Sequence, residues 1–321
     1  MRTRWILPLG LSLVFYAIVY ILIQNGVLRQ YHLQVLSLAA IHVILVASLN
    51  LINGFTGQFS LGHAGFFAIG AYLSGYLTLV QGFPFFIALL AGGMAASIIG
   101  IAIGLPAFRL RGDYLAISTL GFGEIIRVSI LNIRAVGGAR GFSGIPRYTT
   151  FELTFICAVL TVLLIRNFLD SDHGRACLAI RDDEIASKSL GINTTLYKGV
   201  AFAIGSFFAG IAGGLFVHYM QYIAPTPGQI GFLKSIDILI MAVLGGLGSL
   251  TGSVIAAVGL TLLPEFLRGF AEYRMIIYPI LLLLVMLFRP QGLMAGHELS
   301  FAWLDRQFRK LKGGRAHVSQ R

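Results

Sequence analysis

Residues 85–108 read FFIALLAGGMAASIIGIAIGLPAF, a run of apolar and small residues that carries no charge. An α-helix rises 1.5 Å per residue, so about 20 such residues cross the roughly 30 Å hydrocarbon core of a bilayer. Comparable runs recur along the chain, near residues 5–24, 33–53, 60–80, 115–132, 151–169 and 199–220. The sequence therefore predicts an all-α fold, a polytopic membrane helix bundle of about ten transmembrane or re-entrant helices.

The composition excludes a water-soluble globule. Of the 321 residues, 57% are hydrophobic and 12% are charged, whereas an average soluble domain has about 25% charged residues. Glycine is frequent, at 39 residues, and small residues let helix backbones approach closely in a membrane. The formal net charge of +11 comes from basic residues in short loops between apolar runs. We therefore expect a lipid bilayer as the surroundings and no nucleic acid partner.

Residues 235–268 are harder to interpret, because one helix of this length would be about 51 Å long. The segment Gly245–Ser249 is a natural break between two shorter helices, and a last apolar run follows at 275–288. We therefore expect ten crossings, or nine crossings plus a re-entrant hairpin pair. The chain then divides into a transmembrane permease domain over 1–289, with a cytoplasmic loop at 170–198, and a basic cytoplasmic tail over 290–321.

The distribution of basic residues supports this count, because Lys and Arg are enriched in cytoplasmic loops. With both termini cytoplasmic, 16 of the 24 basic residues lie inside and Arg127 falls within a span. The others lie outside, namely Arg29, Arg134, Arg140, Arg147, Lys234, Arg268 and Arg274. A single crossing at 235–268 would instead place the basic tail outside.

A polar, glycine-rich stretch, NGFTGQFSLGHAG at residues 53–65, separates two of the predicted spans. Backbone freed from a helix at membrane depth is tolerated only where protein buries it or it lines a water-filled cavity. Its polar side chains line the translocation pathway or pack helices together, and both interpretations stay open for Thr56, Gln58, Ser60 and His63. No second histidine or acid stands at ligand spacing from His63, so no metal site is expected.

Two opposite charges stand three residues apart within the predicted span 115–132. Glu124 and Arg127 share one helix face at this spacing, and each offsets part of the other's desolvation cost of about 2.5–3.5 kcal/mol. We expect the pair to face the bundle interior, either as an ion pair that holds helices together or as part of the translocation pathway. Asp237, near the start of the eighth span, allows the same two interpretations.

The predicted cytoplasmic loop 170–198 is longer than a connector requires. Ala179, Asp183, Ala186 and Leu190 recur at helical intervals. The acidic residues at 182 and 183 favour a helix start, and Gly191 favours a helix end. A short amphipathic helix is therefore predicted to project into the cytoplasm, either as a solvated connector or as a docking surface for a cytoplasmic partner.

Motifs for catalysis or cofactor binding are absent from the sequence. It contains no Walker Gly-x-x-x-x-Gly-Lys-Ser/Thr motif, so this chain is not expected to hydrolyse ATP. His297 and Glu298 lack the second histidine of a zinc protease, and no nucleophile elbow is present. Cys157 and Cys177 indicate neither a disulfide framework nor a metal cluster. We therefore expect a protein that is not an enzyme and needs no cofactor.

Several blocks of sequence, in order along residues 50–295, resemble one known family. They are Asn53–Ala64, Leu110–Ile117, Thr119–Arg127, Arg175–Ala176, Ala179–Asp182, Glu184–Ala186, Leu190–Ile192, Leu244–Ser249 and Phe288–Leu293. In these blocks the chain is similar to the LivM-type permease of bacterial ABC importers for branched-chain amino acids. The resemblance implies a permease subunit of the bacterial inner membrane that forms the translocation pathway. Permeases for urea and short amides are close relatives, so such a substrate is the alternative.

The resemblance also implies partners, namely a second, LivH-type permease subunit, two cytoplasmic ATPase subunits and a periplasmic substrate-binding protein. The loop 170–198 would resemble the coupling segment of ABC importers, whose pattern is Glu-Ala-Ala followed by a glycine. Here Ile occupies the second position and the glycine follows the Glu by seven residues. The implied ATPase-coupling residues are Asp183, Glu184, Ile185, Ala186, Leu190 and Gly191.

A stand-alone secondary transporter or channel is the competing hypothesis from a different class. Such a protein needs intramembrane acids or a coupling-ion site, and Glu124 and Asp237 are the acids that keep this hypothesis open.

Overall fold

The computed structural model describes residues 30–110, 112–267 and 292–294, with isolated positions at 10, 16, 17, 19, 21, 22, 283 and 287. Residues 35–296 form one compact unit, and residues 1–34 with 297–321 form a second. Apart from the isolated positions and 292–294, the predicted first span at 5–24, the last apolar run at 275–288 and the tail at 290–321 lie outside the described residues.

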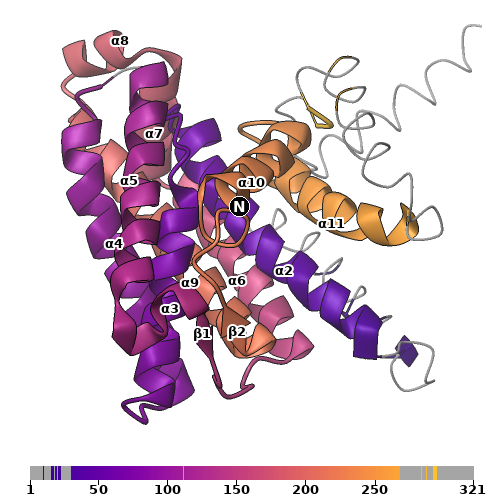
Figure 1. Ribbon diagram of the computed structural model, residues 1–321. Helices are drawn as coiled ribbons and strands as arrows, with labels where there is room; N and C mark the ends of the chain where they lie inside the picture. Colours follow the sequence, from indigo (N-terminus) through magenta and orange to yellow (C-terminus); the bar gives the residue numbers. More distant parts are fainter. Residues whose placement is uncertain are drawn as a thin grey trace, which may run out of the picture. The chain divides into compact units, whose positions relative to one another are not determined.

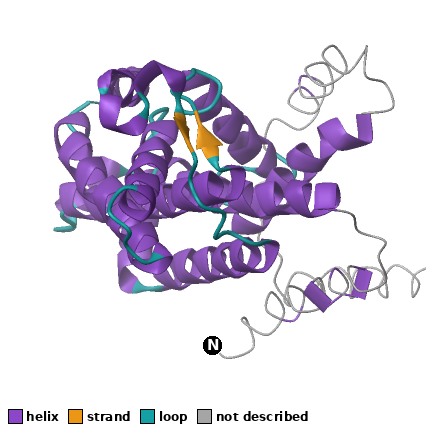
Figure 2. Cartoon of the chain, turned by 60° about the horizontal axis from the view of Figure 1, so that its bottom comes forward, coloured by secondary structure: helices purple, strands orange, loops and turns teal. Residues whose placement is uncertain are grey.

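Helices make up most of the described chain (Figure 1), and Figure 2 shows two short strands among them. In order, the elements are α2 (Gln30–Asn50), the π-helical turn η1 (Leu51–Phe55), α3 (His63–Leu79), α4 (Phe85–Ala107), α5 (Asp113–Asn132), the 3-10 turns η2 (Arg134–Val136) and η3 (Gly138–Arg140), β1 (Phe142–Ser143), α6 (Phe151–Asp170), α7 (Asp172–Asp182), α8 (Glu184–Ser189), α9 (Thr194–Met220), β2 (Tyr222–Ile223), α10 (Phe232–Gly245) and α11 (Leu250–Phe266). The all-α fold is confirmed, and so are the helices predicted in the six spans between 33 and 220.

Among the described residues, five helical segments are long and apolar enough to cross a membrane, namely Gln30–Phe55, Phe85–Ala107, Asp113–Asn132, Phe151–Asp170 and Thr194–Met220. The helices α3, α10 and α11 have 17, 14 and 17 residues, fewer than the about 20 of a usual crossing. The break predicted between 245 and 249 is confirmed, because α10 ends at Gly245 and α11 begins at Leu250.

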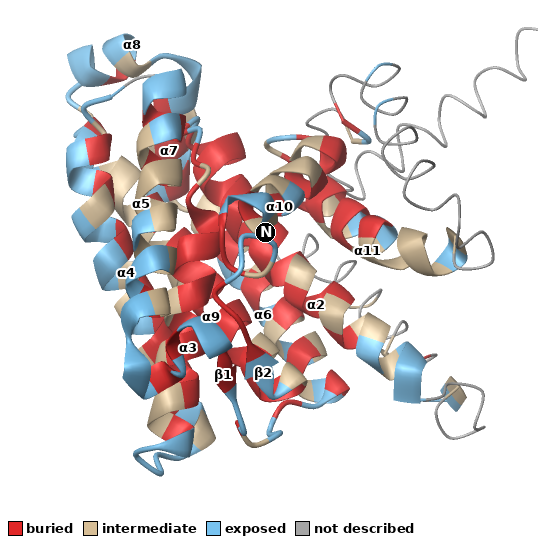
Figure 3. Cartoon of the chain, viewed as in Figure 1, coloured by how far each residue is buried: buried red, intermediate tan, exposed pale blue. Residues whose placement is uncertain are grey.

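The centre of the bundle is α9, which packs against α3 and α4 through small residues. A Cβ atom on Gly70 of α3 would overlap the backbone of Gly210 on α9. Backbone contact of this kind brings membrane helices close together. In Figure 3, α9 is largely buried, whereas α4 has an exposed face that includes Phe86 and Met94. An exposed apolar face is suited to contact with lipid.

Two connections mark opposite ends of the bundle. Strands β1 and β2 pair antiparallel, with Phe142 opposite Ile223, and join the α5–α6 connection to the α9–α10 connection. The helices α7 and α8 lie at the other end (Figure 1). The loop 170–198 and the segment around Arg140 are therefore on opposite sides of the spans.

The loop 170–198 contains two helices, so the single amphipathic helix predicted through Ala179 and Leu190 is wrong. Ala179 lies on α7, whereas Ala186 lies on α8. The break is at Asp183, whose backbone is extended and whose carboxylate accepts hydrogen bonds from the amides of Ile185 and Ala186. Aspartate breaks helices in this way because its side chain competes with the backbone for amide donors.

Candidate functional site

The polar stretch at 53–65 separates two helices, and its side chains form hydrogen bonds with nearby backbone groups. Helix α2 continues into the π-helical turn η1, and α3 begins at His63. Between them, the side chain of Asn53 bonds twice to the backbone of Ser60. Its Nδ2 donates to the Ser60 carbonyl at 3.2 Å, and its Oδ1 accepts from the Ser60 backbone amide at 3.1 Å. The Thr56 hydroxyl donates to the Leu51 carbonyl at 2.9 Å. These side chains satisfy backbone groups that lipid would leave unpaired.

Gln58 and His63 are also buried, yet each keeps one polar atom free. The Gln58 amide nitrogen donates to the Lys198 carbonyl at 3.3 Å, and Nε2 of His63 lies 2.9 Å from the Ser48 hydroxyl. Within the described part of the chain, Oε1 of Gln58 and Nδ1 of His63 are buried without a hydrogen-bond partner. Buried polar groups are usually paired, so these two atoms are exceptions within the described part of the chain.

The stretch between α2 and α3 packs closely against the turn between α10 and α11. A Cβ atom on Gly54 would overlap Oδ1 of Asn50 and the amide nitrogen of Gly248. Oδ1 of Asn50 accepts from the Gly248 amide at 2.9 Å, and Nδ2 donates to the Ser249 carbonyl at 2.9 Å and to the Ser253 hydroxyl at 2.6 Å. We call Gly54, Gly57 and Gly248 the glycine junction.

Arg181, in the last turn of α7, connects the two helices of the loop 170–198 to the glycine junction. Its Nη1 donates to the Gly54 carbonyl at 3.4 Å. A Cβ atom on Gly57 would lie 3.1 Å from Cγ of Arg181, and one on Gly248 would lie 3.1 Å from its Nη1. The arginine therefore fits against all three glycines. This role could not be predicted from the sequence, because Arg181 resembles any basic residue of a polar loop.

Residues 292–294 complete this region from the C-terminal side. The Leu293 amide donates to the Leu244 carbonyl at 2.8 Å, and the Met294 amide donates to the Gly245 carbonyl at 3.3 Å. Blocks of sequence that carry the resemblance, at 53–64, 179–182 and 244–249, thus converge on one place in the fold, together with the described residues 292 and 293 of the block at 288–293. Their separation along the chain gave no sign of this contact.

The predicted ion pair between Glu124 and Arg127 is confirmed, and the pair also binds backbone groups next to and at the start of α10. The Arg127 Nε lies 2.6 Å from the Glu124 carboxylate, and the two side chains are 18% and 26% exposed. The other Glu124 oxygen accepts from the Phe232 amide at 2.9 Å, and Nη1 of Arg127 donates to the Pro225 carbonyl at 3.2 Å. Phe232 is the first residue of α10, so the carboxylate caps this helix, where negative charge is favourable.

Helix α8 is short, but both of its ends are fixed. Asp183 caps the first turn with bonds of 2.8 and 3.0 Å to the amides of Ile185 and Ala186. At the other end, Gly191 has φ of +84°, and the amides of Gly191 and Ile192 donate to the carbonyls of Lys188 and Ser187. This is a Schellman motif, which requires the left-handed conformation that glycine adopts easily. The predicted helix start at 182–183 and helix end at Gly191 are confirmed.

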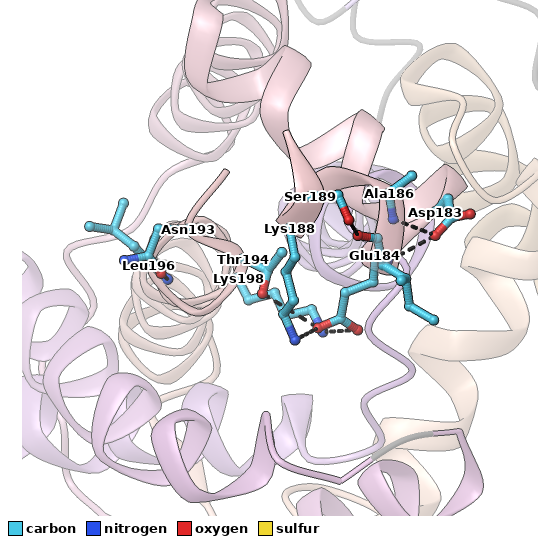
Figure 4. A network of polar contacts seen from close by, with 10 residues as sticks. Asp183, Glu184, Ala186, Lys188, Ser189, Asn193, Thr194, Leu196 and Lys198 are labelled. Atoms are coloured by element: carbon cyan, nitrogen blue, oxygen red, sulfur yellow. Dashed lines mark hydrogen bonds and ion pairs between the residues drawn. The ribbon is translucent and has the colours of Figure 1, made fainter. Parts of the chain in front are cut away.

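Glu184 fixes α8 to the first turn of α9 (Figure 4). Its carboxylate lies 3.1 Å from the Lys188 amine and 2.8 Å from the Lys198 amine. Burial acts to raise the pKa of Glu184, but hydrogen bonds and charges from these two lysines outweigh it and hold the pKa below its ordinary value.

The opposite face of α8 has few contacts within the chain. The Ile185 side chain is 67% exposed and that of Leu190 is 82% exposed, and Ala186 is exposed as well. Large apolar side chains on a small, rigid helix outside the spans are typical of a contact surface.

Comparison with known proteins gives the family. Residues 31–288 match the family described as branched-chain amino acid transport system / permease component. The high-affinity branched-chain amino acid transport system permease protein LivM is 36% identical in both Salmonella typhimurium and Escherichia coli, over 88% of this chain and 73% of each relative. LivH of Escherichia coli is 26% identical over 82% of this chain and 94% of that protein.

Among solved structures, PsaBC from Streptococcus pneumoniae in complex with Fab aligns with a TM-score of 0.47 and 15% identity, over 84% of this chain and 95% of that chain. The family match, by contrast, spans residues 31–288 and includes every long apolar helix described above. This chain is therefore a multi-pass membrane protein that belongs to the family of permease components of branched-chain amino acid transport systems.

Proposed function

We propose that this chain carries branched-chain amino acids inward through a bacterial inner membrane, as one of two permease subunits of an ATP-driven importer. Relatives of both the LivM and the LivH kind support a pair of unlike permeases. Two separate ATPase subunits hydrolyse ATP in the cytoplasm, and a periplasmic binding protein delivers the substrate. ATP binding and hydrolysis then favour one of two arrangements of the bundle over the other.

The structure of α8 supports a role for this helix in coupling ATP hydrolysis to movement of the bundle. This helix is capped at both ends, fixed to α9 through Glu184, and exposes Ile185, Ala186 and Leu190 at one end of the bundle. A surface helix that transmits movement needs this combination of rigidity and apolar contact. Asp183 and Gly191 contribute by setting where the helix begins and ends.

The polar residues of the spans have two roles in this proposal. Thr56 and Ser60 make hydrogen bonds within the stretch between α2 and α3, whereas Glu124 and Arg127 join α5 to the start of α10. Gln58 and His63 are the candidates for the translocation pathway, because each has a buried polar atom left unpaired in the described residues.

The proposed orientation places α8 in the cytoplasm, together with both termini. Arg140 lies two residues before β1, which is at the opposite end from α8 (Figure 1), so Arg140 is then periplasmic. Both native cysteines are free, so serine replaces them first. A single cysteine at position 188 should then react only from the cytoplasmic side, and one at 140 only from outside. Reaction of position 188 from outside would contradict the orientation.

The proposed function is tested by purifying this chain in mild detergent with the partners encoded beside it. Co-purification of ATPase subunits and ATP-dependent uptake of leucine, isoleucine or valine into proteoliposomes are expected. Competition with urea separates the two substrate classes. Uptake of urea alone would favour the amide permeases, and ion-driven uptake by this chain without ATPases would favour a secondary transporter.

A further inference from the structure

Helix α10 carries two charged side chains in its first turns, and neither has an ion-pair partner. Lys234 and Asp237 are the third and sixth residues of this helix. No opposite charge lies within ion-pair distance of either one among the described residues. The charges of Glu124 and Arg127, which fix the start of the same helix, are already paired with each other. An unpaired charge within a membrane bundle indicates a functional site.

The Lys234 amine is directed into the bundle. Its Nζ lies 2.9 Å from Nε2 of His42 on α2, and Nδ1 of His42 lies 2.8 Å from the Thr261 hydroxyl on α11. That hydroxyl donates to the Ala257 carbonyl at 2.6 Å. An ammonium is a donor only, so Nε2 of His42 accepts, and Nδ1 of His42 donates to the Thr261 hydroxyl.

Lysines near the end of a membrane helix usually extend toward the interface. Lys234 instead points at His42, which lies well inside α2, a helix that spans Gln30–Asn50. The amine uses one of its three hydrogens on His42, so the others are free to bind an anion. His42 and Thr261 thus hold the amine in position without neutralising its charge.

Asp237 lies one helical turn beyond Lys234, and its side chain is exposed. A carboxylate inside the membrane region faces protein or water, because contact with hydrocarbon is costly. Residues three apart on a helix have Cβ atoms about 5–6 Å from each other. The two residues therefore share one face of α10, and an α-amino acid carries the two opposite charges that they would bind, a carboxylate and an ammonium joined through a single carbon.

We propose that Lys234 and Asp237 form a zwitterion site on the translocation path, in which Lys234 binds the substrate α-carboxylate and Asp237 binds the α-ammonium. This inference rests on the proposed function, because it takes an amino acid as the cargo. When the substrate binds, each of its two charges exchanges contact with water for contact with one opposite charge of the protein, so the Lys234 and Asp237 charges each gain a partner. Urea and short amides carry no charge, so the same site selects against them.

The test measures binding of three ligands to the assembled permease–ATPase complex without the binding protein. Leucine has both charges, isoamylamine lacks the carboxylate, and 4-methylpentanoate lacks the ammonium. Lys234→Gln should weaken leucine by about tenfold or more, a factor equivalent to about 1.4 kcal/mol, and leave isoamylamine unchanged. Asp237→Asn should weaken leucine by a similar factor and leave 4-methylpentanoate unchanged. Arg140→Gln, which removes an exposed charge elsewhere, is the control.

Three outcomes would overturn the site. These are no measurable leucine binding by the wild-type complex, wild-type leucine affinity in both variants, or equal loss of all three ligands in either variant, which indicates structural damage. Asp237 is exposed, so its variant should assemble even if Lys234→Gln does not. The proposed function fails separately, if the wild-type complex imports urea but not leucine. If the wild-type complex imports leucine and both variants bind leucine with wild-type affinity, the zwitterion site is contradicted but the proposed function is not.

Discussion

The glycine junction and the end of α8 both depend on glycine, but for different physical reasons. At Gly54 there is no room for a Cβ atom, because Asn50 and Gly248 occupy the space. At Gly191 nothing lies within 4 Å of a Cβ atom, yet φ is +84°. The first glycine is required by contact between distant segments, and the second by its own backbone. Changes at the junction should therefore impair folding, whereas changes at α8 should impair contact with a partner.

The largest effect is expected from Gly54→Val. Overpacking usually costs about 1–3 kcal/mol, and here the added atoms meet a backbone amide and a fixed Asn50 side chain, neither of which can move aside. The yield of monodisperse protein in detergent should fall severely. The matched control is Gly121→Val on α5, where a Cβ atom meets nothing within 4 Å. Equal yields from the two variants would show that the junction is not closely packed.

Ala186→Glu should abolish transport while it leaves folding intact. Ala186 is exposed on α8 between the helix caps, so the new charge meets solvent in this chain and an apolar surface in the complex, where burying it is costly. Membrane insertion and yield should match the wild type, and ATPase association and leucine uptake should be lost. Ala139→Glu makes the same change at an exposed position at the other end of the bundle. Normal uptake by Ala186→Glu would refute the assignment of α8 to coupling.

Arg181→Ala should have an intermediate effect, because Arg181 joins the two regions. Its bond to the Gly54 carbonyl is long, at 3.4 Å, so its loss should cost near the lower end of the about 1.5–3 kcal/mol typical of charged donors. The complex should assemble and hydrolyse ATP, but uptake per ATP should fall several-fold. Arg175→Ala, on the same helix with side-chain contacts to Asp170 and Asp172, should retain the wild-type ratio. Equal ratios in the two variants would leave Arg181 with no role in transmission.

The local sequence pattern was enough to predict the helices between residues 33 and 220 and the two ends of α8. Long apolar runs identify helices whatever their partners, and the break at 245–249 follows from glycine alone. Asp183 and Gly191 act on backbone within a few residues of themselves, so their roles could be read from the sequence. The pair of Glu124 and Arg127 is similar, because three residues of spacing set its geometry.

Contacts between distant segments could not be predicted in this way. The Gly54 contact with Gly248, the position of Arg181 against both, and the Glu124 cap on α10 depend on how helices pack. The single helix expected at 179–190 failed because helical spacing continues across Asp183, while the side chain of that residue ends one helix and begins the next. The distribution of basic residues predicted Lys234 in a loop on the outer side of the membrane. In the structure, its amine points toward His42 on α2.

The smallest effect is expected from Gly191→Val. This variant distinguishes a glycine required by its backbone conformation from one required by close packing, such as Gly54. The new side chain has open space, so no steric clash opposes it. Its cost is the left-handed conformation, about 1–2 kcal/mol for a residue with a Cβ atom, and somewhat more for a β-branched one. Because the strain is local, the helix end should loosen while the bundle folds normally. Yield should equal that of Gly121→Val, and uptake should fall by less than in Ala186→Glu. Gly191→Asn, which tolerates this conformation better, should recover part of the uptake. A yield as low as that of Gly54→Val would mean that Gly191 is also required by packing.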